Sequence, residues 1–379
     1  MKKIILLSLL TASVLMADPL VSYPGTKAKG MGGAFTAIAN NNSAMYFNPA
    51  GMVDFDSTKD RTIFTAEVGT GGAFDVSSTS TEPVSSTFNY FVAAGITNPG
   101  YGLGIAVYSL YSITANVKDP NDSTRYITKD QDISALSVSA AYALTNQMYP
   151  WGGAISVGAT IGMAFSGGGL INYETTDEDG TVSNNYDDST LDQRGFFGAV
   201  GIKARVYKSM TFNVDLGANY RSAASLDSVH DSSNSTTAPV NGMDMPSEIA
   251  YGMAAMYLTE HGVFTVSVDK KTTGYKESTS PSNSDMIFGL NDYDTLAFGV
   301  DFSSPIFQLR GGLYESTEVV DGVNSNTLNI SGYTVGAGYV FTKEINIELS
   351  LDNKTYEFQN RDDKSELFGS LSLNFAFEN

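Results

Sequence analysis

This sequence of 379 residues contains no cysteine, only two histidines and no long apolar run. The absence of cysteine excludes a disulfide framework and a lipid-carrying N-terminal cysteine. The apolar run over residues 4–16 is shorter than the roughly 20 residues of a membrane-spanning helix, and no other run is long enough. The two histidines, His230 and His261, fall in expected loops or turns. Neither an EF-hand spacing nor a phosphate-binding loop is found, so the sequence predicts no enzyme, no cofactor and no metal site.

Basic residues are also scarce, with 22 Lys and Arg against 41 Asp and Glu and a net charge of −19. Lys2 and Lys3 precede a short apolar stretch, which predicts a secretory signal peptide over residues 1–17 with cleavage after Ala17. Its removal would leave 20 basic and 41 acidic residues, a charge of about −21. Such an acidic, exported chain is not expected to bind nucleic acid.

The composition favours β structure, with 37 Gly, 21 Tyr and 21 Phe but a single Trp. After residue 59 the chain alternates apolar and polar residues in segments of about ten residues, which is the pattern of transmembrane β-strands. Fourteen such segments are predicted, over residues 61–70, 86–97, 101–111, 132–144, 153–165, 194–206, 210–221, 247–258, 262–271, 293–303, 306–316, 329–341, 345–356 and 367–377.

The alternation is clearest over residues 210–221. One face carries Phe212, Val214, Leu216, Ala218 and Tyr220, and the other carries Asn213, Asp215, Gly217, Asn219 and Arg221. A β-sandwich would also alternate, but its inner faces would be apolar. Small or charged residues on the second face indicate a polar lumen behind a lipid-facing band.

The connections between the segments alternate between short and long. Tight turns such as Asn98-Pro99-Gly100 are separated by long polar loops, including 112–131 and 166–193. Outer-membrane barrels have short periplasmic turns and long outer loops, and an even number of strands leaves both termini in the periplasm. The sequence therefore predicts an all-β chain whose residues 59–379 form a transmembrane antiparallel β-barrel of about 14 strands in the outer membrane of a Gram-negative cell.

Residues 18–58 precede the barrel and are predicted to form a plug, or hatch, in its lumen. The stretch 30–52 is rich in small residues and almost uncharged. A turn is predicted at its end, because proline locks its own φ and keeps the preceding residue extended. This turn is the expected gate and consists of Asn48, Pro49, Ala50 and Gly51.

Fourteen segments behind a plug that ends in Asn-Pro-Ala-Gly resemble the FadL/TodX-type family of outer-membrane transporters for long-chain fatty acids and other hydrophobic compounds. Three further motifs carry the resemblance: Tyr220-Arg221-Ser222, Met245-Pro246-Ser247, and the late pair DTLAFGVDF and QLRGGLYEST. The resemblance implies passive uptake of a hydrophobic small molecule through a plugged barrel whose plug shifts. It also implies a monomer that is inserted by the barrel-assembly machinery and surrounded by outer-membrane lipid.

In that family a distorted third strand opens the barrel wall, so that a ligand leaves sideways into the membrane. The third segment here carries two glycines and a third directly precedes it, and glycine within a strand favours a bulge or bend. The resemblance therefore implies a lateral opening at Gly100, Gly102 and Gly104. The acidic loop over 166–193 departs from the apolar entry groove that the family forms with its outer loops.

Charged side chains in the lumen have two interpretations. Four basic residues point inward by alternation: Lys203, Arg205, Arg221 and Arg310. They can pair with inward carboxylates and pack the plug, because isolated buried charges are costly. Alternatively, one arginine binds a ligand carboxylate, and the apolar part of the ligand lies among plug side chains. The candidates for this apolar contact are Phe35, Ile38, Met45 and Phe47.

Two other functions are compatible with this architecture. The glycine-rich opening of the plug also resembles TraF-like and secretion-associated barrels, which act as assembly components. A small-solute porin would use the same wall. A lumen cavity lined by apolar plug residues favours hydrophobic uptake, an apolar patch on the periplasmic turns favours the assembly component, and an open bore favours the porin.

Overall fold

The structure of the chain is a computed structural model. The residues it describes are 24–53, 55, 62–73, 83–85, 89–118, 125–145, 153–165, 172–177, 182–186, 194–226, 244–274, 292–320, 327–358 and 363–378. The predicted signal peptide (1–17) and parts of the predicted long loops lie outside these residues.

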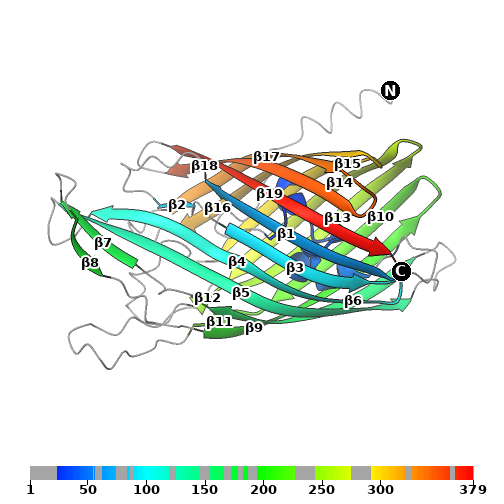
Figure 1. Ribbon diagram of the computed structural model, residues 1–379, viewed down its shortest axis with the longest axis horizontal. Helices are drawn as coiled ribbons and strands as arrows, with labels where there is room; N and C mark the ends of the chain where they lie inside the picture. The colour runs from blue at the N-terminus through cyan, green and yellow to red at the C-terminus, as the bar shows by residue number, and fades with distance from the viewer. Residues whose placement is uncertain are drawn as a thin grey trace.

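One sheet closes on itself to form a barrel (Figure 1). Its wall consists of β1 (Ile63–Ala73), β3 (Asn89–Thr97), β4 (Tyr101–Lys118), β5 (Arg125–Thr145), β6 (Ala154–Phe165), β9 (Arg194–Lys208), β10 (Phe212–Arg221), β13 (Ser247–Thr259), β14 (Gly262–Gly274), β15 (Tyr293–Ser303), β16 (Phe307–Val320), β17 (Thr327–Val340), β18 (Ile345–Phe358) and β19 (Lys364–Glu378). Each strand pairs antiparallel with the next. Pairing of β1 with β19, from Ile63 opposite Glu378 to Ala73 opposite Phe368, closes the ring. The fourteen predicted segments are confirmed as a closed 14-strand antiparallel barrel.

Two regions predicted to be loops contain strands instead. β4 and β5 continue as a long hairpin, in which Lys118 lies opposite Tyr126. β7 (Asn172–Asp177) pairs with β5, and β8 (Val182–Tyr186) pairs with β7. The prediction of loops over 112–131 and 166–193 was therefore wrong in these parts. Alternating β-branched residues in the hairpin, such as Ile113 and Ile127, favour a strand even among polar neighbours.

The two ends of the barrel differ as predicted. Figure 1 shows the strand extensions at the end opposite the C-terminus, and short turns at the end where the C-terminus lies. The short strands β2 (Pro83–Ser85), β11 (Ala224–Ser225) and β12 (Asp244–Met245) also belong to the extended end. We call the two ends the loop side and the turn side.

The outer face of the wall carries apolar side chains at alternate positions. Along β10, Phe212, Leu216 and Tyr220 are exposed, while the intervening Asn213 and Asp215 are buried in the lumen. Ile161 and Phe196 are both 74% exposed. Such a wide apolar surface is stable when it faces lipid rather than water, so the barrel lies in the outer membrane, as predicted. Within the described part of the chain, no helix is long and apolar enough to span a membrane.

Residues 24–53, which we call the inner segment, lie inside the barrel (Figure 1, dark blue). They form α2 (Thr26–Gly30), α3 (Ala44–Phe47) and the 3-10 turn η1 (Pro49–Met52), joined by irregular chain. α2 ends before Gly32 and Gly33, which have positive φ values of 63° and 80° that suit glycine. The inner segment lies within the predicted plug, while the predicted boundaries at residues 18 and 58 lie outside the described residues.

Candidate functional site

Asn48 fixes the turn at the end of the inner segment. Its backbone is extended, with φ −167°, as predicted for a residue before proline. Its side-chain Oδ1 accepts a hydrogen bond from the Ala50 N–H at 3.1 Å. Its Nδ2 donates to the Thr36 carbonyl at 2.9 Å and to the Ile202 carbonyl of β9 at 3.0 Å. One amide side chain thus caps η1 and fastens the inner segment to the barrel wall.

Asp269 of β14 holds the middle of the inner segment. Its carboxylate accepts hydrogen bonds from the backbone N–H groups of Phe35 (2.8 Å) and Thr36 (2.5 Å). The sequence analysis did not single out Asp269, although alternation along β14 places it in the lumen with Thr265 and Ser267. The two N–H groups whose hydrogen bonds it accepts are backbone amides of the inner segment, which leave no side-chain signal in a sequence.

Hydroxyl groups of the wall satisfy carbonyls of the inner segment. Ser156 donates to Ala50 at 2.7 Å, Thr160 to Met45 at 3.1 Å and Thr334 to Gly30 at 3.0 Å. A buried, irregular chain must find partners for its backbone groups outside itself. The Ser and Thr residues on the inward face of the strands provide them.

Gly102 and Gly104 support the inner segment rather than a break in the wall. A Cβ on Gly102 would lie 2.4 Å from the Met52 carbonyl oxygen, and one on Gly104 would lie 2.4 Å from Cε of Met45. The pairing of β3 with β4 runs without a shift through both glycines, and so does that of β4 with β5 up to Ser109. The irregular step comes only after Ser109. Gly100 lies in the preceding turn, where its N–H donates to Asn98 Oδ1 at 2.7 Å. The strand distortion expected at these glycines is therefore not found.

The inward charges form buried ion pairs. Arg205 binds both carboxylate oxygens of Asp215, at 2.7 and 3.0 Å, and the Lys203 ammonium lies 4.0 Å from the same carboxylate. Arg310 contacts Asp301 and Glu348, each at 2.8 Å. These pairs correspond to the first interpretation, in which the charges pack the lumen.

Arg221 pairs with Glu248 at 2.6 Å, and its guanidinium lies 4.5 Å from the centre of the Tyr46 ring. Glu248, at the start of β13, was not identified from the sequence, although it opens the inward series with Ala250 and Ala254. Each of the three predicted arginines is thus paired with a carboxylate from a neighbouring strand.

The Arg205–Asp215 pair provides a stability prediction. Replacing Asp215 by Asn should leave the Arg205 charge buried and poorly compensated, lowering the free energy of unfolding by about 3–5 kcal/mol. Urea-induced unfolding in lipid vesicles, followed by heat-modifiable gel mobility, measures the change. Glu260→Gln is the matched control, because Glu260 lies in an exposed turn with an 86% exposed side chain. Equal stability of the two variants would contradict a role for the pair in stabilising the barrel.

The loop side of the lumen holds an apolar cluster beside the buried Arg221–Glu248 pair. Side chains from many strands meet there and pack against Phe35, Tyr46 and Phe47 of the inner segment, and Phe35 and Phe47 meet edge to face with ring centres 5.5 Å apart. We call this set the loop-side apolar cluster; its wall members include Tyr108, Leu110, Ile133, Leu226, Met245, Tyr293, Val319, Leu328, Ile330 and Tyr356. The predicted ligand residues Phe35 and Phe47 therefore contact this cluster, and Met45 is buried within it.

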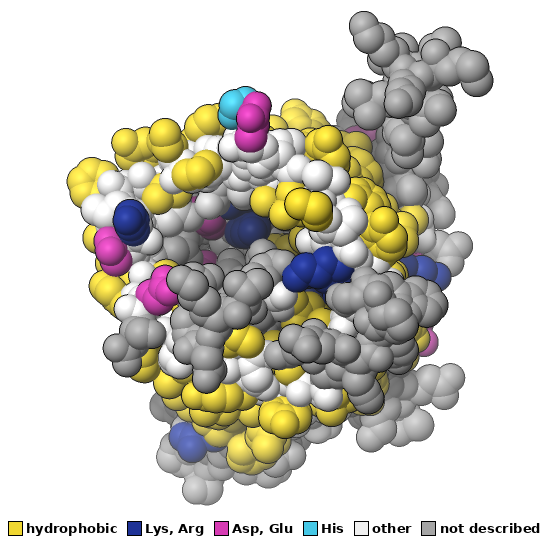
Figure 2. All heavy atoms as spheres, turned by 90° about the vertical axis from the view of Figure 1, so that its right-hand side faces the viewer, with side chains coloured by type: hydrophobic (Ala, Val, Ile, Leu, Met, Phe, Trp, Pro, Cys, Tyr) yellow, Lys and Arg dark blue, Asp and Glu magenta, His cyan; other side chains and the backbone are white. Residues whose placement is uncertain are grey.

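A cavity of about 380 Å³ opens on the turn side of the inner segment. Figure 2 shows it as a hollow in that face, with basic and acidic side chains inside. The predicted residues Ile38, Lys203 and Arg205 line it, whereas Arg221 lies on the other side of the inner segment with Tyr46. The structure thus divides the predicted site residues between the loop-side apolar cluster, with Arg221 and Glu248 beside it, and the turn-side cavity.

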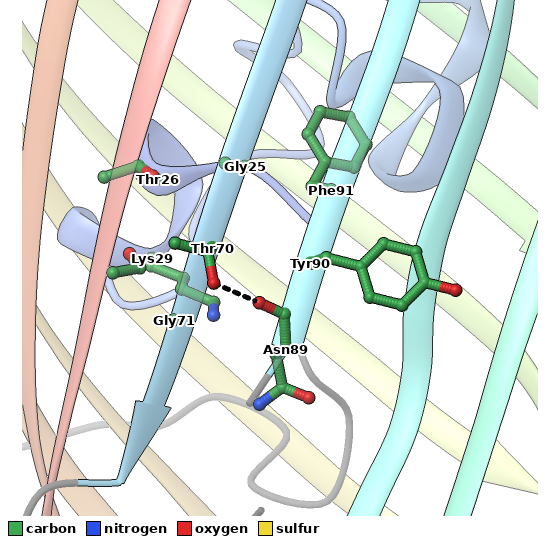
Figure 3. A pocket seen from close by; sticks show the side chains of 10 residues that line it. Gly25, Thr26, Lys29, Thr70, Gly71, Asn89, Tyr90 and Phe91 are labelled. Carbon is green, nitrogen blue, oxygen red and sulfur yellow. Dashed lines mark hydrogen bonds between the residues drawn. The ribbon is translucent and has the colours of Figure 1, made fainter. Parts of the chain in front are cut away.

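Two smaller cavities beside the inner segment hold no more than a few waters. One, of about 20 Å³, lies between α2 and strands β1 and β3 (Figure 3). Lys29 and Asn89 reach into it, and Thr70 donates a hydrogen bond to the Asn89 carbonyl at 3.0 Å. The other, of about 30 Å³, is lined by Tyr46, Phe47 and Asp269. Since one water needs roughly 10–15 Å³, neither cavity can accept a ligand without movement of the inner segment.

Solved structures of outer-membrane channels share this fold. The CymD monoaromatic hydrocarbon channel matches with a TM-score of 0.60 and 15% identity, over 95% of this chain and 99% of that one. The Pseudomonas putida toluene transporter TodX matches with 0.55 and 13%, over 96% and 99%. A Pseudomonas aeruginosa FadL homologue matches with 0.53 and 12%, over 96% and 99%. No protein-family model and no curated protein matches the sequence. The resemblance stated from the sequence motifs is confirmed at the level of the fold.

Proposed function

We propose that the chain is a passive outer-membrane channel for hydrophobic small molecules, in which the inner segment is the plug. The observation that carries this proposal is the loop-side apolar cluster, which is continuous with aromatic side chains of the inner segment. A polar solute gains nothing from such a surface, whereas an apolar one gains about 25 cal/mol for each Å² removed from water. The CymD and TodX channels are described as carrying a monoaromatic hydrocarbon and toluene, which supports the same class here.

A shift of the inner segment is part of the proposal. Its contacts with the wall are backbone hydrogen bonds and close glycine contacts, and the cavities next to it on the loop side are water-sized. This packing argues against the permanently open bore of a small-solute porin. A ligand in the apolar cluster must displace side chains such as Tyr46 and Phe47 to advance.

We further propose that the ligand leaves through the turn-side cavity. The uninterrupted pairing of β4 with its neighbours at Gly102 and Gly104 favours this route over a sideways exit at those residues. The cavity lies directly beyond Ile38 and Gly51 of the inner segment. No energy source is needed if the ligand moves down its concentration gradient.

Uptake of labelled toluene by cells with and without the protein tests the proposal. Ile330→Asp should reduce protein-dependent uptake about tenfold or more, because an unpaired carboxylate in the apolar cluster is costly to desolvate. Ile330→Val, which keeps the site apolar, is the control and should retain uptake. If cells lacking the protein take up toluene as fast as those containing it, the proposed function is wrong.

A further inference from the structure

Five aromatic rings follow one another through the loop-side apolar cluster. Phe35, Phe47 and Tyr46 belong to the inner segment, whereas Tyr108 of β4 and Phe91 of β3 belong to the wall. Successive ring centres lie 5.5, 5.0, 5.9 and 6.2 Å apart, and the first three pairs meet edge to face. Each separation is within the roughly 4.5–7 Å of favourable aromatic pairs. Tyr46 lies where this series passes from the inner segment to the wall.

Tyr46 also has a cation over its ring. The guanidinium carbon of Arg221 lies 4.5 Å from the ring centre, well inside the roughly 6 Å of a cation–π contact. Both residues are only 4% exposed, and such a contact is stronger when the cation is removed from water. By comparison, the Lys27 ammonium lies 6.0 Å from the centre of the Phe35 ring, at the limit of such a contact.

The barrel wall holds the Arg221 guanidinium in place. Arg221 of β10 lies opposite Glu248 of β13 in the strand pairing, and their side chains form the ion pair of 2.6 Å. Lys271 of β14 reaches the same carboxylate oxygen at 3.6 Å. Three adjacent strands therefore fix the cation, whereas Tyr46 belongs to the inner segment, which shifts in the proposed function. When Tyr46 moves, the guanidinium stays in place and loses its ring.

The chemistry of the incoming molecule decides whether this loss is compensated. An aromatic ligand that takes the place of Tyr46 presents its own π face to Arg221, so that one cation–π contact replaces another. A saturated ligand of the same size has no such face and leaves the buried guanidinium without a π partner. The hydrophobic gain of the two ligands is similar, because it follows the apolar area removed from water.

We propose that Arg221 determines the specificity of the channel and favours aromatic over saturated hydrocarbons, because the ligand ring replaces the Tyr46 ring on its guanidinium. Pairing with Glu248 positions the guanidinium and balances its charge, so the site selects a π face rather than an anionic group. The inference rests on the proposed function and adds the residue that discriminates between hydrophobic ligands.

Protein-dependent uptake of labelled toluene and labelled methylcyclohexane by cells tests the proposal, since the two molecules have the same carbon skeleton. The ratio of the two uptake rates is the readout. Combining Arg221→Met with Glu248→Gln removes both charges, so that neither is left buried without its partner. This double variant should lower the ratio of toluene to methylcyclohexane uptake about tenfold. Arg221→Lys keeps a cation at the site and should retain most of the preference.

Tyr46→Leu is the matched variant for the ring that is exchanged. It removes the ring but keeps Arg221 and Glu248, so toluene gains a contact with the guanidinium and methylcyclohexane loses none. The ratio of the two uptake rates should therefore be unchanged. A ratio that falls in Tyr46→Leu, or one that stays the same in the double variant, overturns the role of Arg221.

Heat-modifiable gel mobility shows whether each variant forms the barrel. If the double variant does not, a crystal of the unaltered protein soaked with para-bromotoluene decides, because the bromine is located by its anomalous scattering. The ligand ring is expected within about 6 Å of the Arg221 guanidinium, and a ligand bound only elsewhere overturns the proposal. Equal uptake of the two hydrocarbons by the unaltered protein refutes the role of Arg221 alone, whereas uptake of neither refutes the channel.

Discussion

Replacing Gly51 by alanine is expected to dislodge the inner segment while the barrel wall remains intact. A Cβ at this position would lie 1.8 Å from the Ala39 carbonyl oxygen and 2.7 Å from the carbonyl carbon. Both are backbone atoms, and they cannot yield in the way that the end of a flexible side chain can. Overpacking in a tight interior costs about 1–3 kcal/mol or more, and here the whole cost falls on the contact between η1 and the preceding chain.

The expected readout is a new conductance. In planar bilayers the Gly51→Ala variant should pass ions in steps that the unaltered protein does not show, because the inner segment no longer fills the lumen. Gly198→Ala is the matched control, since a Cβ there would have its nearest contact at 3.8 Å, with Thr160 O. A Gly51→Ala channel that stays closed and keeps its toluene uptake would show that the inner segment does not seal the lumen.

Asp269→Ala is expected to loosen the inner segment from the opposite wall. The buried carboxylate accepts the N–H groups of Phe35 and Thr36, and its removal leaves both without a protein acceptor. Each buried N–H left unsatisfied costs about 1–3 kcal/mol. Taking about 2 kcal/mol as the net loss, the two amides should exchange with deuterium roughly 30-fold faster.

Hydrogen–deuterium exchange of a peptide covering residues 33–40 measures this effect. Asp294→Ala is the control. Asp294 of β15 forms an ion pair at 2.7 Å with Lys270, the neighbour of Asp269 on β14, but its side chain is 50% exposed. Its removal should leave exchange of the peptide unchanged. Similar exchange in both variants would mean that the inner segment is held by its other contacts.

Period-two alternation was sufficient to predict the wall. Each strand is exposed to lipid on one face and to the lumen on the other, so the environment imposes the same alternation on its residues. The prediction that Arg205 and Arg310 point inward was confirmed for the same reason. The placement of short turns at one end of the barrel and long loops at the other was likewise predicted, from the contrast between Asn98-Pro99-Gly100 and the long polar stretches.

The details of the site were harder to predict because they depend on contacts between distant parts of the chain. Glu248 and Asp269 face the lumen like many other residues, and only the path of the inner segment shows what they bind. Gly102 and Gly104 are compatible with either a bend or a close contact, and sequence cannot distinguish the two. The extended hairpin of β4 and β5 was missed because its polar residues resemble those of a loop.

The pairing of β1 with β19 has a consequence for the order of assembly. It joins residues 63 and 378, near the beginning and the end of the chain, and therefore closes the largest loop in the molecule. The inner segment immediately precedes β1, and its backbone lies within van der Waals distance of β10, β13 and β16. The same segment packs through α2 against β16, β17, β18 and β19. Although it precedes β1 in the sequence, it can complete its contacts with the wall only when the last strands have formed, so the start of the folded lumen depends on the end of the chain.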